Sequence, residues 1–297
     1  MIFNSFGDYI ICDGAMGTML QNHGLGRGER SDLMNMTAPQ AVEDIHRMYV
    51  DAGSNLIYTN TFGANAYALQ DTAYEPEDII EAAVSIARRA SQGAALVALD
   101  IGPIGILLEP MGDLMLEKAY ELFRQQAIAG ERAGADLAVI ETMSDIAELK
   151  TAILAVAENT ALPVVATMTF DQTGHTYLGC TPETLAQTAQ QLGIAAVGIN
   201  CSLAPAGMIE TIRRIAGATS LPLVIKPNAG LPEGIMGRYS IDPAEFAAQM
   251  LIFTELEDIS SSIDPMNENR VSRRRLLIGG CCGTTPEYIR EIRNLIK

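Results

Sequence analysis

Eight short apolar segments rich in β-branched residues recur along the chain, and each is followed by a stretch with helical spacing. One strand–helix unit therefore occurs about every 37 residues of the 297-residue chain. The predicted strands are Ile10–Cys12, Asn55–Thr59, Leu96–Asp100, Leu137–Glu141, Val164–Met168, Ala196–Asn200, Leu223–Lys226 and Leu276–Gly279. Eight such units predict an α/β fold, a single-domain (β/α)8 TIM barrel over residues 1–297, more economically than a doubly wound sheet.

Composition and charge exclude several classes of function. The formal net charge of −16 argues against nucleic acid or an anionic membrane surface as partner, since both need a basic footprint. No apolar run approaches the roughly 20 residues of a membrane span, and no basic, apolar leader begins the chain. Five cysteines, an odd number, do not suggest a disulfide framework. We expect a cytoplasmic protein whose thiols stay reduced.

The chain's cysteines indicate a metal site. Cys281 and Cys282 are adjacent, follow an apolar strand and are flanked by glycines, whereas Cys201 ends another strand. Adjacent cysteines rarely form a disulfide, but both can bind one soft cation. The carboxyl ends of barrel strands converge on one face, so Cys201 can meet the pair although about 80 residues separate them. Three thiolates with an open fourth position are typical of catalytic zinc. Cys12 and Cys180 are interpreted as apolar fillers.

Six motifs in order resemble the homocysteine S-methyltransferase family over nearly the whole chain, with the homocysteine-binding barrel of cobalamin-dependent methionine synthase as the nearest likeness. They are Asp13-Gly14-Ala15-Met16-Gly17-Thr18, Thr59-Asn60-Thr61-Phe62, Glu141-Thr142-Met143-Ser144-Asp145, Gly198-Ile199-Asn200-Cys201, Pro227-Asn228-Ala229-Gly230 and Gly279-Gly280-Cys281-Cys282-Gly283-Thr284-Thr285-Pro286. The resemblance implies a zinc-thiolate barrel that methylates L-homocysteine to L-methionine. Coordination to Zn²⁺ would remove the proton of a substrate thiol, which suits alkyl transfer.

The resemblance also implies roles for single residues. Cys201, Cys281 and Cys282 would be the catalytic zinc ligands, with the homocysteine sulfur in the open position. Asn228 is a candidate ligand that substrate displaces, and Asn200 a neighbour that supports the ligands.

The amino-acid end of the substrate needs binding groups of its own. Glu141 would bind the ammonium, with capping of the next helix as the alternative. Gly17 and Thr18, in a turn that leads into a helix, would bind the carboxylate. Asp13 would orient that turn or contact the ammonium.

The methyl donor is open at this point. No folate-binding barrel or cobalamin module is recognised in the sequence, so we expect methylcobalamin on a cobalamin-carrying partner protein. S-methylmethionine, S-adenosylmethionine and betaine are alternative donors. A hypothesis of another class is a non-catalytic homocysteine-binding module. A zinc hydrolase is weaker, because no histidine–glutamate zinc motif occurs.

Three further segments are interpreted without a catalytic role. A polar stretch at about 256–275 departs from the family pattern; we expect a disordered surface insertion at the strand-entry face, with a docking element as the alternative. His175 is interpreted as a solvated turn residue rather than a fourth ligand. Asp44-Ile45-His46 is expected in an amphipathic helix, and Gly24–Gly28 in a loop.

Overall fold

The computed structural model describes residues 2–26, 28–233, 238–256, 259, 261–264 and 267–296, and its centre is an eight-stranded parallel sheet. The strand order is β1-β12-β7-β6-β5-β4-β3-β2. A parallel bridge between Cys12 and Leu56 joins the two end strands, so the sheet closes into the predicted barrel. The strands are β1 (Tyr9–Ile11), β2 (Leu56–Tyr58), β3 (Leu96–Ile101), β4 (Leu137–Met143), β5 (Val164–Met168), β6 (Ala196–Asn200), β7 (Leu223–Lys226) and β12 (Leu276–Ile278).

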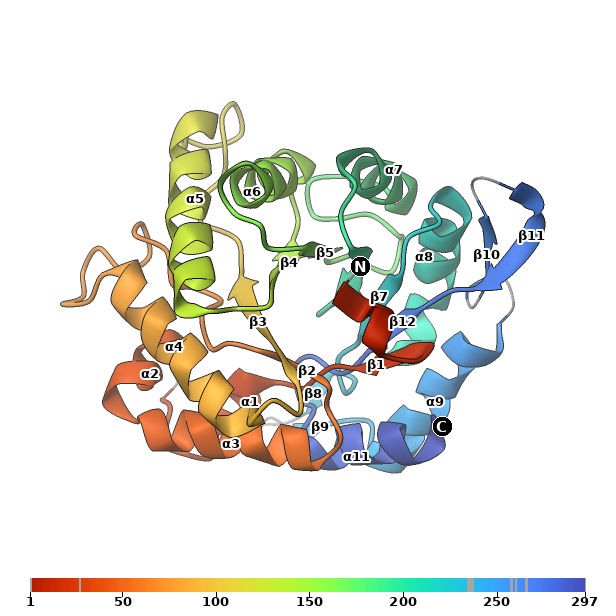
Figure 1. The fold of residues 1–297 in the computed structure, drawn as a ribbon, viewed down its shortest axis with the longest axis horizontal. Helices are drawn as coiled ribbons and strands as arrows, with labels where there is room; N and C mark the ends of the chain where they lie inside the picture. The colour runs from red at the N-terminus through yellow and green to blue at the C-terminus, as the bar shows by residue number, and fades with distance from the viewer. Residues whose placement is uncertain are drawn as a thin grey trace.

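Helices follow the strands and surround the barrel (Figure 1). They are α1 (Met16–Gln21), α2 (Met34–Thr37), α3 (Pro39–Asp51), α4 (Pro76–Ser91), α5 (Leu116–Ala133), α6 (Ile146–Asn159), α7 (Pro182–Leu192), α8 (Pro205–Ala218), α9 (Pro243–Glu255) and α11 (Pro286–Leu295), with 3₁₀ turns η1 (Ile2–Ser5) and η2 (Ser31–Leu33). Proline opens six of the helices, because its fixed φ suits the first turn and its missing N–H is not needed there. No helix in the described part of the chain combines the length and apolarity needed to cross a bilayer.

Alternate residues of each strand pack on opposite sides of the barrel wall. Ile10 and Cys12 face the interior, where Phe3 of η1 also packs, whereas Ile11 joins the larger core between strands and helices. Cys12 is fully buried and Cys180 is 7% exposed, in agreement with their interpretation as apolar fillers. The interior below the carboxyl ends is thus filled, and the functional space lies above it.

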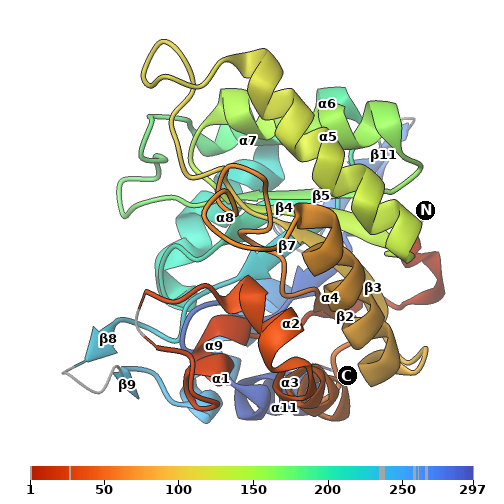
Figure 2. The ribbon, with the colours of Figure 1, turned by 90° about the vertical axis from the view of Figure 1, so that its left-hand side faces the viewer.

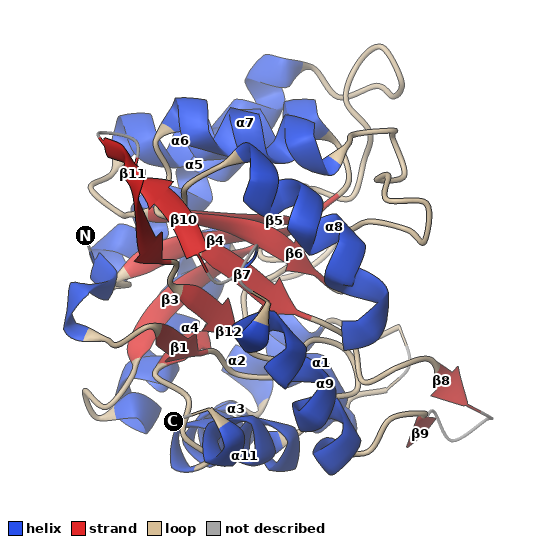
Figure 3. Ribbon diagram, turned by 90° about the vertical axis from the view of Figure 1, so that its right-hand side faces the viewer, coloured by secondary structure: helices blue, strands red, loops and turns tan. Residues whose placement is uncertain are grey.

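Two small antiparallel pairs stand outside the barrel, at opposite ends (Figure 3). β8 (Pro232–Glu233) pairs with β9 (Arg238–Tyr239) at the carboxyl ends of the barrel strands, and β10 (Ser261–Asp264) pairs with β11 (Asn267–Arg273) at the opposite end. The expectation that 256–275 is disordered is therefore wrong for the residues that form β10 and β11, because antiparallel pairing joins main-chain groups and does not require apolar side chains. Its expected position, away from the strands' carboxyl ends, is confirmed.

The long βα loops gather at the carboxyl end of the barrel (Figure 2). The β2–α4 and β3–α5 loops, orange and yellow in that view, extend to the same side as β8 and β9, while both termini lie toward the other. A site at this end therefore draws its residues from many separate parts of the chain.

Candidate active site

A cavity of about 350 Å³ lies at the carboxyl ends of the strands. This size falls in the range of small-molecule sites. Its wall comes from the ends of β1, β2, β3, β4, β6, β7 and β12, and from α1. The lining residues are Asp13, Gly14, Ala15, Met16, Gly17, Thr18, Ser31, Tyr58, Thr59, Asn60, Phe62, Asp100, Glu141, Thr142, Cys201, Lys226, Gly280, Cys281 and Cys282. Seven of the nine predicted site residues thus line one cavity, whereas Asn200 and Asn228 are not among its lining residues.

The three predicted cysteines meet at one end of this cavity. Their sulfur atoms all lie within 4.8 Å of one another, with 3.3 Å between the Sγ atoms of Cys201 and Cys282. Backbone bonds hold the loops: Cys281 donates to the carbonyl of Pro227 at 2.7 Å, and Cys201 donates to that of Lys226 at 3.2 Å. Cys201 has a φ of 48°, a strained conformation for a residue with a side chain. The loops thus hold three soft donor atoms together, at the cost of backbone strain at Cys201.

The grouped thiols strongly perturb one another. Hydrogen bonds from Cys201 and Cys281 lower the pKa of Cys282 to about 3, whereas contacts with its two neighbours raise the pKa of Cys201. One sulfur is therefore readily ionised, and each further thiolate meets increasing repulsion. A soft divalent cation would compensate that charge, so the donor set fits Zn²⁺.

Asn200 contacts the cluster as a supporting residue. It is completely buried, and its Nδ2 lies 3.8 Å from the Sγ of Cys281. Its Oδ1 accepts from the backbone N–H of Thr142 at 2.9 Å and from the hydroxyl of Thr167 at 2.7 Å. The amide is thereby fixed between β4, β5 and the cysteines.

Asn228 stands directly beside the cluster. Its neighbours in sequence bond both cysteines, since Pro227 accepts from Cys281 and Ala229 donates to the carbonyl of Cys282 at 2.9 Å. The Nδ2 of Asn228 donates to the carbonyl of Ser202 at 3.4 Å, but its buried Oδ1 has no hydrogen-bond partner among the described residues. A buried oxygen without a partner is costly, and a cation would satisfy it.

Asp13 is held in an ion pair. Its Oδ1 accepts from the Nζ of Lys226 at 2.8 Å, its Oδ2 accepts from the backbone N–H of Tyr58 at 2.7 Å, and both charged side chains are 4% exposed. The ammonium also lies 3.5 Å from the centre of the Tyr58 ring. Both oxygens of Asp13 are thus occupied, which favours the turn-orienting role over direct contact with an ammonium.

Glu141 enters the cavity from an irregular part of β4. The register of β4 against β5 shifts between Ile140 and Met143, and Thr142 has a φ of 61°. Such a bulge re-aims side chains. Burial, then the charge of Cys281, raise the pKa of Glu141 to about 8, against the lowering influence of Lys226. The capping alternative is wrong, because the side chain that caps α6 is that of Asp145, which accepts from Ala147 at 2.7 Å.

Gly17 and Thr18 lie in the first turn of α1 and line the cavity. No atom within 4 Å would meet a Cβ at Gly17, so this edge is open. The hydroxyl of Thr18 accepts from the backbone N–H of Gly283 at 3.1 Å and thus ties α1 to the loop of Cys281 and Cys282.

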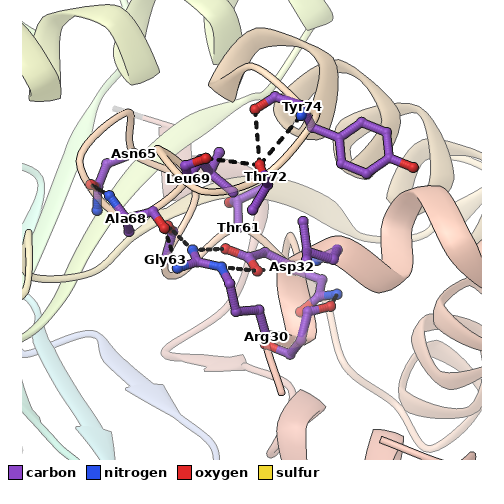
Figure 4. Close-up of polar contacts among 12 residues, drawn as sticks. Arg30, Asp32, Thr61, Gly63, Asn65, Ala68, Leu69, Thr72 and Tyr74 are labelled. Atoms are coloured by element: carbon purple, nitrogen blue, oxygen red, sulfur yellow. Dashed lines mark hydrogen bonds and ion pairs between the residues drawn. The ribbon is translucent and has the colours of Figure 1, made fainter. Parts of the chain in front are cut away.

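An arginine joins the two loops that form another wall. Figure 4 shows Arg30 between Asp32 and the β2–α4 loop: its guanidinium donates to both oxygens of Asp32, at 3.2 and 2.7 Å, and to the carbonyls of Gly63 and Ala68, both at 2.7 Å. Ser31 and Phe62, adjacent to these anchors, line the cavity. The sequence did not identify this network.

Other predictions can be placed. His175 is exposed in the β5–α7 loop, in agreement with a turn residue, and Asp44–His46 lies within α3. Three cavity residues with ionisable side chains were missed as site residues: Asp100, Lys226 and Tyr58. The available signal was a charged residue at the end of an apolar strand, which applies to Asp100 and Lys226.

Comparison with known proteins agrees with this geometry. The family model described as homocysteine S-methyltransferase matches residues 10–296. The chain belongs to this family. Proteins named methionine synthase from Mycobacterium leprae and Mycobacterium tuberculosis are each 32% identical over 95% of this chain. The match covers 24% of each relative, so the chain spans about a quarter of their length.

Solved structures of another protein share the fold of this chain. The homocysteine methyltransferase MmuM from Escherichia coli, in a metallated form, superposes with a TM-score of 0.79 at 21% identity, covering 99% of this chain and 100% of that one. Its apo form gives a TM-score of 0.71 at 23% identity. These structures show the fold, and the predicted family is confirmed by the family model and the methionine synthase relatives.

Proposed function

We propose that this chain binds Zn²⁺ through Cys201, Cys281 and Cys282 and transfers a methyl group to the sulfur of L-homocysteine, giving L-methionine. The observation that carries the proposal is the three-thiol cluster at one end of a cavity that also contains carboxylates. The three cysteines would coordinate the ion. The Oδ1 of Asn228 would occupy the fourth coordination position until the substrate sulfur displaces that oxygen. Family membership and the names of the relatives support homocysteine as the acceptor.

A divalent ion held there would supply the positive charge that lowers the pKa of a substrate thiol and maintains it as thiolate. The chain's own residues would bind and position the substrate. Glu141 accepts from the substrate ammonium, Gly17 and Thr18 lie where its carboxylate fits, and Asn200 fixes the loop beside Cys281. The substrate sulfur forms a bond to the methyl carbon as the donor's leaving group departs with the bonding electron pair.

For the donor we propose methylcobalamin held by another protein or by another part of a longer protein. The support is that the curated relatives are named methionine synthase and are about four times longer than the matched region. Cobalt(I) leaves with the bonding electrons, whereas methyltetrahydrofolate has a poor amine leaving group. The second candidate is a small donor such as S-methylmethionine, which membership of the homocysteine S-methyltransferase family leaves open.

The test is methionine formation by the zinc-loaded protein, supplied with homocysteine and, separately, methylcobalamin, S-methylmethionine, S-adenosylmethionine or betaine. We expect turnover with methylcobalamin and little with betaine. Fast turnover with a small donor alone would reject the donor and retain the acceptor. No methionine with any donor, despite bound homocysteine, would favour the non-catalytic binding module.

A further inference from the structure

The charges of the cavity wall do not balance. Its lining includes three carboxylates, those of Asp13, Asp100 and Glu141, and one ammonium, that of Lys226. The hydrogen bond of that ammonium to a carboxylate goes to Asp13, in the buried ion pair. Lys226 lowers the pKa of both Asp100 and Glu141 through its charge, but among the described residues neither carboxylate has an ion-pair partner, although both border the space that a substrate would fill.

Asp100 is an unusual buried carboxylate. It is 7% exposed, and neither of its carboxylate oxygens accepts a hydrogen bond from the residues the structure describes. Its Oδ1 is fully enclosed. Burial, followed by the charge of Glu141, raises the pKa of Asp100 well above its usual value. Leaving such a group unpaired costs free energy, which a bound cation would recover.

The backbone of Asp100 is nevertheless held by two threonine hydroxyl groups. The hydroxyl of Thr59 accepts from the backbone N–H of Asp100 at 3.0 Å, and the hydroxyl of Thr61 donates to its carbonyl at 2.7 Å. The two hydroxyls are 2.7 Å apart, and both threonines are buried. The hydroxyls of Thr59 and Thr61 thus fix the backbone of Asp100 on both sides, and these bonds account for the burial of the two hydroxyl groups.

We infer that Asp100 is a substrate-binding residue that, with Glu141, forms a two-carboxylate clamp for the α-ammonium of the acceptor, while Asp13 serves only to hold the wall. The inference rests on the proposed function and adds a residue that decides specificity. One ammonium between the two carboxylates satisfies the free oxygens of Asp100 and reduces the repulsion between the two acids. The clamp selects α-amino thiols over simple thiols, since only the former bring the compensating charge.

The test compares two ligands that differ in the amino group alone, L-homocysteine and 4-mercaptobutanoate. Calorimetry on the zinc-loaded protein measures both dissociation constants for the wild type, for Asp100→Asn and for the control Asp145→Asn, which removes a helix-capping carboxylate outside the cavity. We expect Asp100→Asn to weaken homocysteine binding by about tenfold or more, as for loss of a charged hydrogen bond, with 4-mercaptobutanoate changed by less than about threefold. The control should keep the wild-type ratio.

An unchanged ratio in Asp100→Asn, with homocysteine still bound by the wild type, would overturn the clamp alone. Failure of the wild type to bind homocysteine would overturn the proposed function together with the clamp. Circular dichroism and zinc content establish that each variant is folded and loaded. If Asp100→Asn does not fold, Asp100→Ser permits the same comparison with a smaller side chain.

Discussion

Buried charge is arranged differently at the two ends of the cavity, the sulfur end with Cys201, Cys281 and Cys282 and the carboxylate end with Asp13 and Lys226. At the sulfur end, three thiols converge, and no cationic side chain within the described part of the chain is bonded to them; the loops are held by backbone bonds such as that from Cys281 to Pro227. At the carboxylate end, Lys226 neutralises Asp13 within the protein. Under the proposed function, the sulfur end would therefore need a bound cation to hold its thiolates together, whereas the carboxylate end is partly neutralised by the chain itself.

The largest effect expected at the carboxylate end comes from breaking its ion pair. Lys226→Met should lower the free energy of unfolding by about 3–5 kcal/mol, because Asp13 is left buried and unpaired. Urea unfolding measures the change. The matched control is Arg214→Met, which breaks the 2.6 Å pair with Glu183 at a site where the side chains are 29% and 40% exposed; its loss should stay below about 1 kcal/mol.

If the two variants lose similar stability, the view that Asp13 is a structural carboxylate is wrong. Adding Asp13→Asn to Lys226→Met removes the unpaired charge and should restore part of the loss.

A smaller effect separates substrate binding from metal binding. Glu141→Ala should weaken homocysteine binding by about 2–4 kcal/mol, since it truncates one side of a buried charged hydrogen bond. Its zinc content should equal that of the wild type, because Glu141 is not one of the three grouped cysteines that would hold the ion. Calorimetry and metal analysis on the same preparation check both statements. Lost zinc would mean that the two ends are not independent, and unaltered affinity would remove Glu141 from the substrate site.

Much of this arrangement was predictable because strand periodicity is local and the barrel rule is general. The eight apolar runs predicted the barrel, and the barrel brought Cys201 to Cys281 and Cys282 before any contact was known. Helix starts are local as well, since a proline stands at the first position of α3, α4, α7, α9 and α11. These features depend on short segments and on one topological rule.

What the sequence did not reveal depends on pairs of residues far apart. Lys226 and Asp13 are 213 positions apart, and nothing local to either one indicates that they pair. Asp100 was included in a predicted strand, but its lack of a partner is visible only when the surroundings of the side chain are known. The β10–β11 hairpin was missed because its residues are polar, whereas the strand pattern sought was apolar.

The central claim, that the sulfur end holds a zinc ion whose open position receives the substrate, is tested most directly by X-ray absorption at the zinc edge. Zinc-loaded protein without substrate should show three sulfur ligands at about 2.3 Å and one oxygen or nitrogen ligand. Adding L-homocysteine should change this to four sulfurs, and Cys201→Ser should reduce the sulfur count by one if zinc is retained. A ligand set unchanged by homocysteine, or fewer than three sulfurs in the wild type, would contradict the account.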